Sequence, residues 1–367
     1  MMGRSSLQSD KSGEFVLHSS SMNSPSKQAE RSVEIWLWVL IFLIFSMVLL
    51  GGITRLTHSG LSIVEWKPLM GAIPPLSQGD WLVLFHRYQA FPEYQLINQH
   101  MTLEGFQAIF YLEYFHRLLG RLIGLVFLLP LLYFALKKIL TVQATLKLGG
   151  IFLLGGLQGA MGWYMVQSGL VDIPRVSPYR LTAHLLLALL LIGLLLRQAF
   201  LRRNPQPGKL HPFSTTVLVL LVLMIALGGF VAGNKAGLAF NTFPLMQGRL
   251  IPADLYTLQP WWRDCFENLA TVQFHHRLLG WLLLGLMPVY AFWLGKRAPI
   301  LRRSAILLAS LTLFQFSLGV FTLLYKVPVN LAAAHQGGGV LLLGLTLWVS
   351  MKFSVYAGLK SEMTLTR

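Results

Sequence analysis

The chain has 367 residues, of which 54% are hydrophobic and only 12% are charged, and its formal net charge is +16. Soluble globular domains carry about 25% charged residues, so this composition excludes an ordinary soluble protein and indicates a membrane protein. A single cysteine, Cys265, excludes an internal disulfide.

Eight apolar stretches follow one another along the chain, and each is long enough to cross a bilayer as a helix, which takes about 20 residues. They lie at 35–55, 106–136, 145–167, 180–200, 213–233, 266–295, 300–324 and 329–351. The polar, Ser-rich residues 1–33 lack the apolar segment of a signal peptide, so we predict a disordered cytoplasmic tail there. The sequence thus predicts an all-α membrane protein with eight transmembrane helices.

The placement of the basic residues predicts how these helices are oriented. With the N-terminus in the cytoplasm, the inner segments carry 18 Lys and Arg residues, whereas the longer outer segments carry 9. This bias follows the positive-inside rule, so we predict that both termini are cytoplasmic. Because topology explains the charge, we expect no nucleic-acid binding.

The sequence repeats a unit of four helices. EYFHRLLGR at 113–121 returns as QFHHRLLGW at 273–281, and LLGGITRLTHSGL at 49–61 returns as ALGGFVAGNKAGL at 226–238. An even number of helices makes both copies run the same way, so an axis along the membrane normal relates them. We predict two four-helix bundles. They occupy 34–201, with a long outer loop at 56–105, and 211–352, with a cytoplasmic linker at 202–210 and a cytoplasmic tail at 353–367.

Four histidines stand at matched positions of the repeat, towards the outer side of the membrane: His116, His184, His276 and His335. Zinc requires three or four closely spaced ligands, which the sequence does not supply, whereas a haem iron takes two axial imidazoles. Each histidine has a small residue four positions later, on the same helical face; these are Gly120, Ala188, Gly280 and Gly339. The pattern predicts one haem in each bundle, against the alternatives of hydrogen-bonded structural histidines and of small residues that only pack helices.

Charged residues accompany two of these histidines. Arg117 and Arg277 follow them directly, and we predict that they pair with haem propionates. Arg121 occurs in the first copy only, and either binds a propionate or extends to the outer interface. Glu113 lies one helical turn before His116, whereas the second copy has Gln273 there. A carboxylate beside only one haem suggests chemistry at that haem, and the alternative is a structural ion pair with a nearby arginine.

Several long stretches resemble one known family. GGITRLTHSGLSIVEWKP, PEYQLINQHMTLEGFQAIFYLEYFHRLLGR, HHRLLG and AAAHQ are similar to segments of the haem A synthases, in the branch shared by proteobacteria and mitochondria. The resemblance runs from about residue 36 to residue 348. It implies oxidation of a ring methyl of haem O to a formyl group, which gives haem A for cytochrome oxidase.

The resemblance also implies roles for particular residues. His116 and His184 would ligate the substrate haem O, His276 and His335 would ligate a permanent haem b, and Glu113 would be the catalytic carboxylate. One branch of the family has a cysteine pair in an outer loop, which this chain lacks.

Other functions and several partners stay open at this point. A di-haem electron-transfer cytochrome explains the four histidines but not the difference between Glu113 and Gln273, and a haem or solute transporter explains only the repeat. We expect a multi-pass protein of the bacterial cytoplasmic membrane with its haem sites towards the periplasm. Membrane lipid, haem O synthase, cytochrome oxidase assembly factors and an unidentified electron acceptor are the expected partners, and homo-oligomerisation is undecided. The outer loop 56–105 either caps the first site or lies at the interface.

Overall fold

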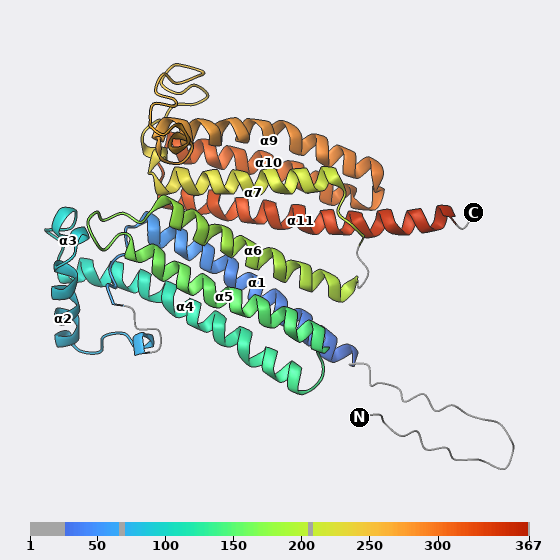
Figure 1. Ribbon diagram of the computed structural model, residues 1–367, viewed down its shortest axis with the longest axis horizontal. Helices are drawn as coiled ribbons and strands as arrows, with labels where there is room; N and C mark the ends of the chain where they lie inside the picture. The colour runs from blue at the N-terminus through green and yellow to red at the C-terminus, as the bar shows by residue number, and fades with distance from the viewer. Residues whose placement is uncertain (1–25, 66–69, 205–207, 366–367) are drawn as a thin grey trace, which may run out of the picture.

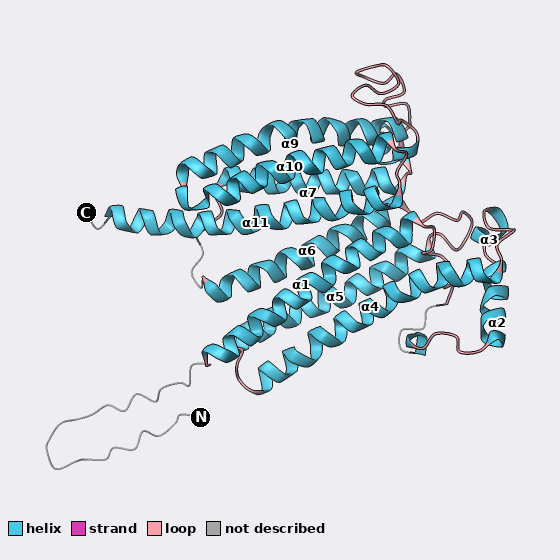
Figure 2. Ribbon diagram, turned by 180° about the vertical axis from the view of Figure 1, so that it is seen from behind, coloured by secondary structure: helices cyan, strands magenta, loops and turns pink. Residues whose placement is uncertain are grey.

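The computed structural model describes residues 26–65, 70–204 and 208–365, and in this part of the chain every regular element is a helix. Eight of the helices are long and apolar enough to cross a membrane, which confirms the predicted fold class. They are α1 (Lys27–Leu56), α4 (Leu103–Leu136), α5 (Val142–Gln167), α6 (Pro178–Arg203), α7 (Pro212–Gly233), α9 (Leu269–Arg297), α10 (Arg302–Leu324) and α11 (Val329–Leu365). Figure 2 shows them in one colour, joined by loops.

Two helices extend beyond the apolar stretches and into segments predicted as tails. α1 begins at Lys27, where the side chain of Ser26 accepts a hydrogen bond from the amide of Ala29, and α11 continues to Leu365. The predicted tails 1–33 and 353–367 are therefore helical over their membrane-proximal parts. Residues 1–25 lie outside the described part of the chain. In Figure 1, the start of α1 and the end of α11 lie at the same end of the molecule.

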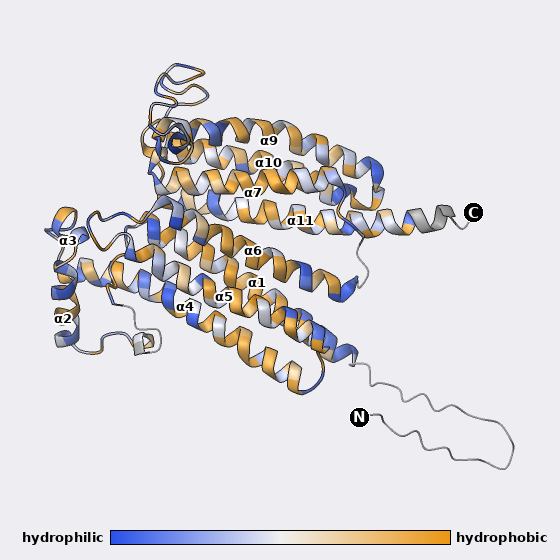
Figure 3. Ribbon diagram, viewed as in Figure 1, coloured by the Kyte–Doolittle hydropathy of each residue, from blue (hydrophilic) through white to orange (hydrophobic). Residues whose placement is uncertain are grey.

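The helices form two four-helix bundles that lie side by side (Figure 1). In the first, α1 and α5 each pack against both α4 and α6, and in the second, α7 and α10 each pack against both α9 and α11. The two histidine-bearing helices of each bundle are thus diagonal to one another. They are α4 and α6 in the first bundle, and α9 and α11 in the second. Large apolar side chains such as Leu129, Leu153 and Phe292 are exposed on the outer faces. Orange apolar residues cover the middle of the helices in Figure 3, as lipid contact requires.

The same surface of each bundle forms the contact between them. α1 packs against α11, and its repeat counterpart α7 packs against α6. A side-chain atom on Gly52 of α1 would meet Gln336 of α11, and one on Gly229 of α7 would meet Thr182 of α6. Glycine at both places lets the two helices approach closely with these side chains between them.

The outer loop of the first bundle folds into a cap of two short helices, α2 (Gln78–Gln89) and α3 (Pro92–Leu96). Trp81 and Tyr88 of α2 are buried against Phe106 and Phe110 at the outer end of α4. Trp81 and Phe110 meet edge to face, with ring centroids 5.0 Å apart. The loop is therefore packed onto the first bundle as a cap.

Candidate functional site

The four predicted histidine ligands all lie against glycines of a neighbouring helix. A Cβ atom added to Gly51, Gly162, Gly228 or Gly319 would lie between 2.7 and 3.2 Å from the Cε1 atom of one histidine ring. The pairs are Gly51 with His116, Gly162 with His184, Gly228 with His276, and Gly319 with His335. Each imidazole thus lies directly on a helix backbone, at equivalent places in both halves.

The second bundle brings its two histidine rings together across the diagonal. The ring centroids of His276 and His335 are 6.5 Å apart, with the ring planes at 84°. Since bonds between a metal and an imidazole nitrogen are about 2 Å long, a single metal ion between the rings spans this separation. The structure therefore pairs the two predicted ligands of this bundle.

A matched glutamine holds the fourth-helix histidine of each bundle. Nε2 of Gln158 donates to the backbone oxygen of His184 at 3.1 Å, and Nε2 of Gln315 donates to that of His335 at 2.7 Å. The same amide nitrogen lies 3.4 Å from Nε2 of His184, or 3.1 Å from Nδ1 of His335. Each glutamine stands four residues before the glycine under the same ring, so one helical face of α5 or α10 supplies both contacts.

The residues present fit a haem in each bundle. The Nδ1 atoms of His116, His184 and His276 are buried and have no hydrogen-bond partner among the described residues. Buried polar atoms normally have partners, so these rings are suited to an additional ligand. Two imidazoles from diagonal helices are the donor set of a six-coordinate haem iron.

The small residues four positions after the histidines contact protein side chains. A Cβ atom on Gly120 would lie 3.4 Å from the Cε of Met47, and one on Gly280 would lie 3.4 Å from that of Met224. Gly339 faces the side chain of Gln315, and Ala188 is buried in the core. These residues thus contact neighbouring side chains at ordinary van der Waals distance, and the glycines that touch the rings are other residues.

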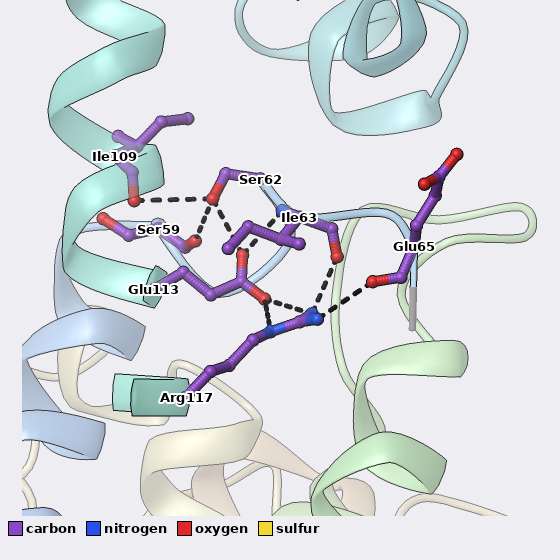
Figure 4. A network of polar contacts seen from close by, with 7 residues as sticks. All are labelled: Ser59, Ser62, Ile63, Glu65, Ile109, Glu113 and Arg117. Carbon is purple, nitrogen blue, oxygen red and sulfur yellow. Dashed lines mark hydrogen bonds and ion pairs between the residues drawn. The ribbon is translucent and has the colours of Figure 1, made fainter. Parts of the chain in front are cut away.

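Glu113 is fixed by a network that ties α4 to the start of the outer loop (Figure 4). Glu113 as a residue is 4% exposed. Its Oε2 accepts from the hydroxyl of Ser62 and the amide of Ile63, both at 2.8 Å. Its Oε1 accepts from Nη2 and Nε of Arg117, at 2.6 and 3.1 Å. Both oxygens are thus held, and the negative charge is compensated by an arginine one turn away.

Gln273 occupies the equivalent place in the second bundle with the opposite hydrogen-bond polarity. Its Nε2 donates to the backbone oxygens of Ala236 and Phe240, at 3.1 and 3.2 Å, and its Oε1 accepts from Arg277 at 3.3 Å. The first loop presents an amide to Glu113, whereas the second loop presents carbonyls. A glutamine can donate to them, and a carboxylate cannot.

Arg117 and Arg277, the two arginines predicted to bind haem propionates, have different hydrogen-bond partners in the structure. Arg117 is paired with Glu113 and also donates to the backbone oxygens of Ile63 and Glu65, at 2.7 and 3.0 Å. Arg277 donates to backbone oxygens of the second outer loop, and none of the described carboxylates pairs with it. Its Nε is buried without a partner among the described atoms. The alternative considered for Glu113, an ion pair with a nearby arginine, is thus present in the structure.

Sequence reasoning missed two groups of residues that the structure brings to the rings: the four glycines beneath them and the two glutamines. Their signal is the repeat itself. Gly51 and Gly228 stand in LGG segments, and Gln158 and Gln315 stand four residues before Gly162 and Gly319. Comparing the copies position by position, instead of searching for ionisable residues alone, would have identified them.

Comparison with known proteins identifies the family of the chain. Residues 34–347 match the model of a family described as cytochrome oxidase assembly protein. The chain belongs to this family. It is 53% identical over 333 residues to a protein of Nitrosospira multiformis, with 88% of this chain and 93% of the relative covered.

Two further relatives support the same family assignment. The chain is 47% identical over 348 residues to a protein of Nitrosomonas eutropha, with 91% and 97% covered. It is 44% identical over 333 residues to one of Wolbachia pipientis wMel, with 89% and 94% covered. All three relatives are named heme A synthase.

Proposed function

We propose that this protein acts as a haem A synthase, oxidising a ring methyl of haem O to a formyl group so that the product can serve cytochrome oxidase. The relatives' names and the family membership support this activity. The observation that carries it is the difference within the repeat. Two equivalent histidine sites differ by a buried carboxylate, Glu113, in one and an amide, Gln273, in the other.

The charge of the two sites supports a different occupant for each. Glu113 neutralises Arg117 in the first bundle, whereas Arg277 keeps its positive charge in the second. A carboxylate ligand is held more strongly by an uncompensated arginine. We infer that His276, His335 and Arg277 hold a resident haem b through its iron and a propionate, and that His116 and His184 hold haem O, which must enter and leave.

The first site can stabilise the positive charge that develops when the methyl carbon is oxidised. With water as the oxygen source, oxidation to the alcohol releases two electrons and two protons, and oxidation to the aldehyde releases as many again. Ser62, Ile63 and Arg117 hold Glu113 in place, so the carboxylate is preorganised, as electrostatic stabilisation requires, and the positive charge at the methyl carbon would share it with Arg117. Bound haem b supplies a one-electron redox centre within the same chain.

Pigment analysis of the purified protein tests this function. Cells that make haem O should give protein that contains haem b together with haem O or haem A, whereas cells without haem O synthesis should give haem b alone. His276→Ala should lose the haem b, and His116→Ala should lose haem O and haem A. Haem b at both sites in cells that make haem O would instead support a di-haem electron-transfer cytochrome.

The cellular setting follows from the same proposal. A multi-pass protein with haem sites near the capped end of the bundles takes its substrate within the bilayer. We place that end towards the periplasm of a bacterial cytoplasmic membrane, with haem O synthase and cytochrome oxidase assembly factors as the neighbouring activities.

A further inference from the structure

His275 precedes the ligand His276 and has no counterpart in the first half, where Phe115 takes its place. In the structure it lies in a groove of about 720 Å³ between α7 and α9. The groove is lined by Leu223 and Leu227 of α7 and by His275, Leu278, Trp281 and Leu282 of α9. Leu223, Leu278 and Leu282 are exposed, so the groove opens on the face that contacts lipid.

His275, which lines the groove, is paired with Tyr256 of the second outer loop, a residue that lies beside the lining. The hydroxyl of Tyr256 lies 2.8 Å from Nε2 of His275. Tyr256 has a φ of 55°, in the left-handed region that is uncommon for a bulky residue, and its amide donates to Thr271 of α9 at 3.3 Å. The loop is thus held in a costly conformation that brings a phenol to the histidine of the groove, as is common at functional sites.

The lining determines which kind of molecule fits. It contains no Lys, Arg, Asp or Glu, so an anionic phospholipid head group would find no cation there. A neutral ring with carbonyl oxygens would find one hydrogen-bond donor in the His275–Tyr256 pair, a flat aromatic surface in Trp281 and leucines for an apolar tail. The site already described is adjacent, because His276 is the next residue and Leu279 belongs both to the groove and to the core of the bundle.

We propose that this groove binds a lipid-soluble quinone, which accepts the electrons released by methyl oxidation; this rests on the proposed function. In the first oxidation a C–H bond breaks and a C–O bond to water forms. The methyl group and water become a hydroxymethyl group, and the quinone takes the two electrons and two protons as a quinol. A second quinone is reduced in the same way as the alcohol becomes the aldehyde. The His275–Tyr256 pair has one free donor, either Nδ1–H of His275 or the hydroxyl of Tyr256, and this donor binds a quinone oxygen.

Binding of a short-tailed benzoquinone to the protein in phosphatidylcholine nanodiscs tests the site directly. Quenching of tryptophan fluorescence reports occupancy, and Trp281→Phe identifies the part of the signal that comes from the groove. His275→Phe introduces the residue that the first half has at this position. It should weaken binding about tenfold, which is the effect of one lost hydrogen bond in an apolar site. Tyr256→Phe should weaken binding by a similar factor. Leu223→Trp should abolish it by filling the groove while His275 stays in place.

The control is Phe292→Leu, a lipid-facing residue of α9 outside the groove, which should bind the quinone as the wild type does. The haem spectrum of every variant must match that of the wild type, which separates loss of the groove from loss of the fold. Equal quinone binding by the wild type, His275→Phe and Leu223→Trp would overturn the inference. It would indicate that lipid acyl chains occupy the groove.

Anaerobic turnover with haem O separates this inference from the proposed function. The wild type should form haem A and quinol together, and His275→Phe should raise the KM for quinone more than it lowers kcat. If the wild type forms haem A with ferricyanide but reduces no quinone, only the quinone site is wrong. If neither acceptor supports haem A formation, the proposed function is wrong.

Discussion

At the scale of single residues, the difference between Glu113 and Gln273 serves two purposes at once. Each side chain matches the polarity of its own loop, since Ile63 offers an amide and Ala236 and Phe240 offer carbonyls. Each also sets the charge beside its arginine. The structural role of the carboxylate therefore coincides with the chemical role that we propose for it, and a single substitution would remove both.

We expect Glu113→Gln to lower turnover of haem O at least about 100-fold, the usual contribution of a positioned charged group. It should also lower the free energy of unfolding by about 3 kcal/mol, because Arg117 would stay buried without its carboxylate. The double substitution Glu113→Gln with Arg117→Gln should restore stability without restoring turnover. Denaturation and haem A formation measure the two effects, and near-wild-type turnover of the double variant would show that Glu113 is only structural.

At the scale of helices, the position of a histidine ring depends on the glycine beneath it. Gly51 and Gly319 leave no space for a methyl group, because the Cβ would lie 2.8 and 2.7 Å from the Cε1 of His116 and His335. The atom in the way belongs to a side chain that can rotate. An added methyl group should therefore displace the ring and leave the helices in place.

We expect Gly51→Ala to lose haem from the first bundle only, and Gly319→Ala to lose it from the second only. Gly150→Ala on α5 is the control, since a Cβ there meets nothing within 4 Å, and it should be neutral or more stable by up to about 1 kcal/mol. Pigment stoichiometry and helix content by circular dichroism distinguish the outcomes. Normal haem content in Gly51→Ala would mean that His116 does not bind at this position.

The outer cap contains a carboxyl group of its own. Glu93 of α3 is 3% exposed, accepts a hydrogen bond from the hydroxyl of Tyr88 at 3.3 Å, and has a pKa raised by burial to about 7. The negative charge of Glu113 raises this pKa further, and Tyr88 and Lys235 oppose the rise. Glu93 is therefore protonated in the folded cap over a pH range in which it is ionised when unfolded.

We expect stability to fall as the pH rises from about 4.5 to 7, because the folded protein then holds a proton that the unfolded chain has released. The loss amounts to about 3 kcal/mol at most. Glu93→Gln mimics the protonated group, so its stability should change less over this range and should exceed that of the wild type at pH 8. Denaturation at pH 5 and pH 8 measures the difference, and identical pH profiles for both proteins would contradict it.

At the scale of the whole molecule, the two ends of the bundles differ in charge and in folded loops. The cap and the second outer loop lie at one end of the bundles, and the start of α1 and the end of α11 lie at the other (Figure 1). All four histidines stand in the N-terminal halves of their helices, which follow the outer loops. The side of the membrane that each end faces is predicted from the basic residues alone.

We expect Cys265, in the second outer loop, to react with a membrane-impermeant maleimide added to spheroplasts. In a Cys265→Ser background, Lys138→Cys between α4 and α5 should react only after permeabilisation, because Lys138 is exposed at the opposite end. Labelling of Lys138→Cys in intact spheroplasts would show that the orientation is opposite to the predicted one, with the histidine sites on the cytoplasmic side.

The sequence predicts those features that depend on local composition or on the repeat. The eight helices follow from hydropathy, and the two bundles and the pairing of His276 with His335 follow from matched positions. The contacts of Gly51 and Gln158 with the rings depend on how neighbouring helices are rotated, which hydropathy does not report. The partner of Arg117 depends on the path of residues 59–65. The start of α1 at Lys27 depends on the N-cap residue Ser26, which precedes the apolar stretch. The haem ligands and the role of Glu113 stay predictions.

The contact between the bundles has a consequence for the origin of the chain. α1 meets α11 as α7 meets α6, so the contact is isologous: one surface is used twice about a twofold axis. A single ancestral gene for four helices could have closed the same contact as a homodimer, with two identical sites imposed by symmetry. A single chain that holds both halves is free of that constraint, and Glu113 and His275, each present in one copy only, make its two sites different.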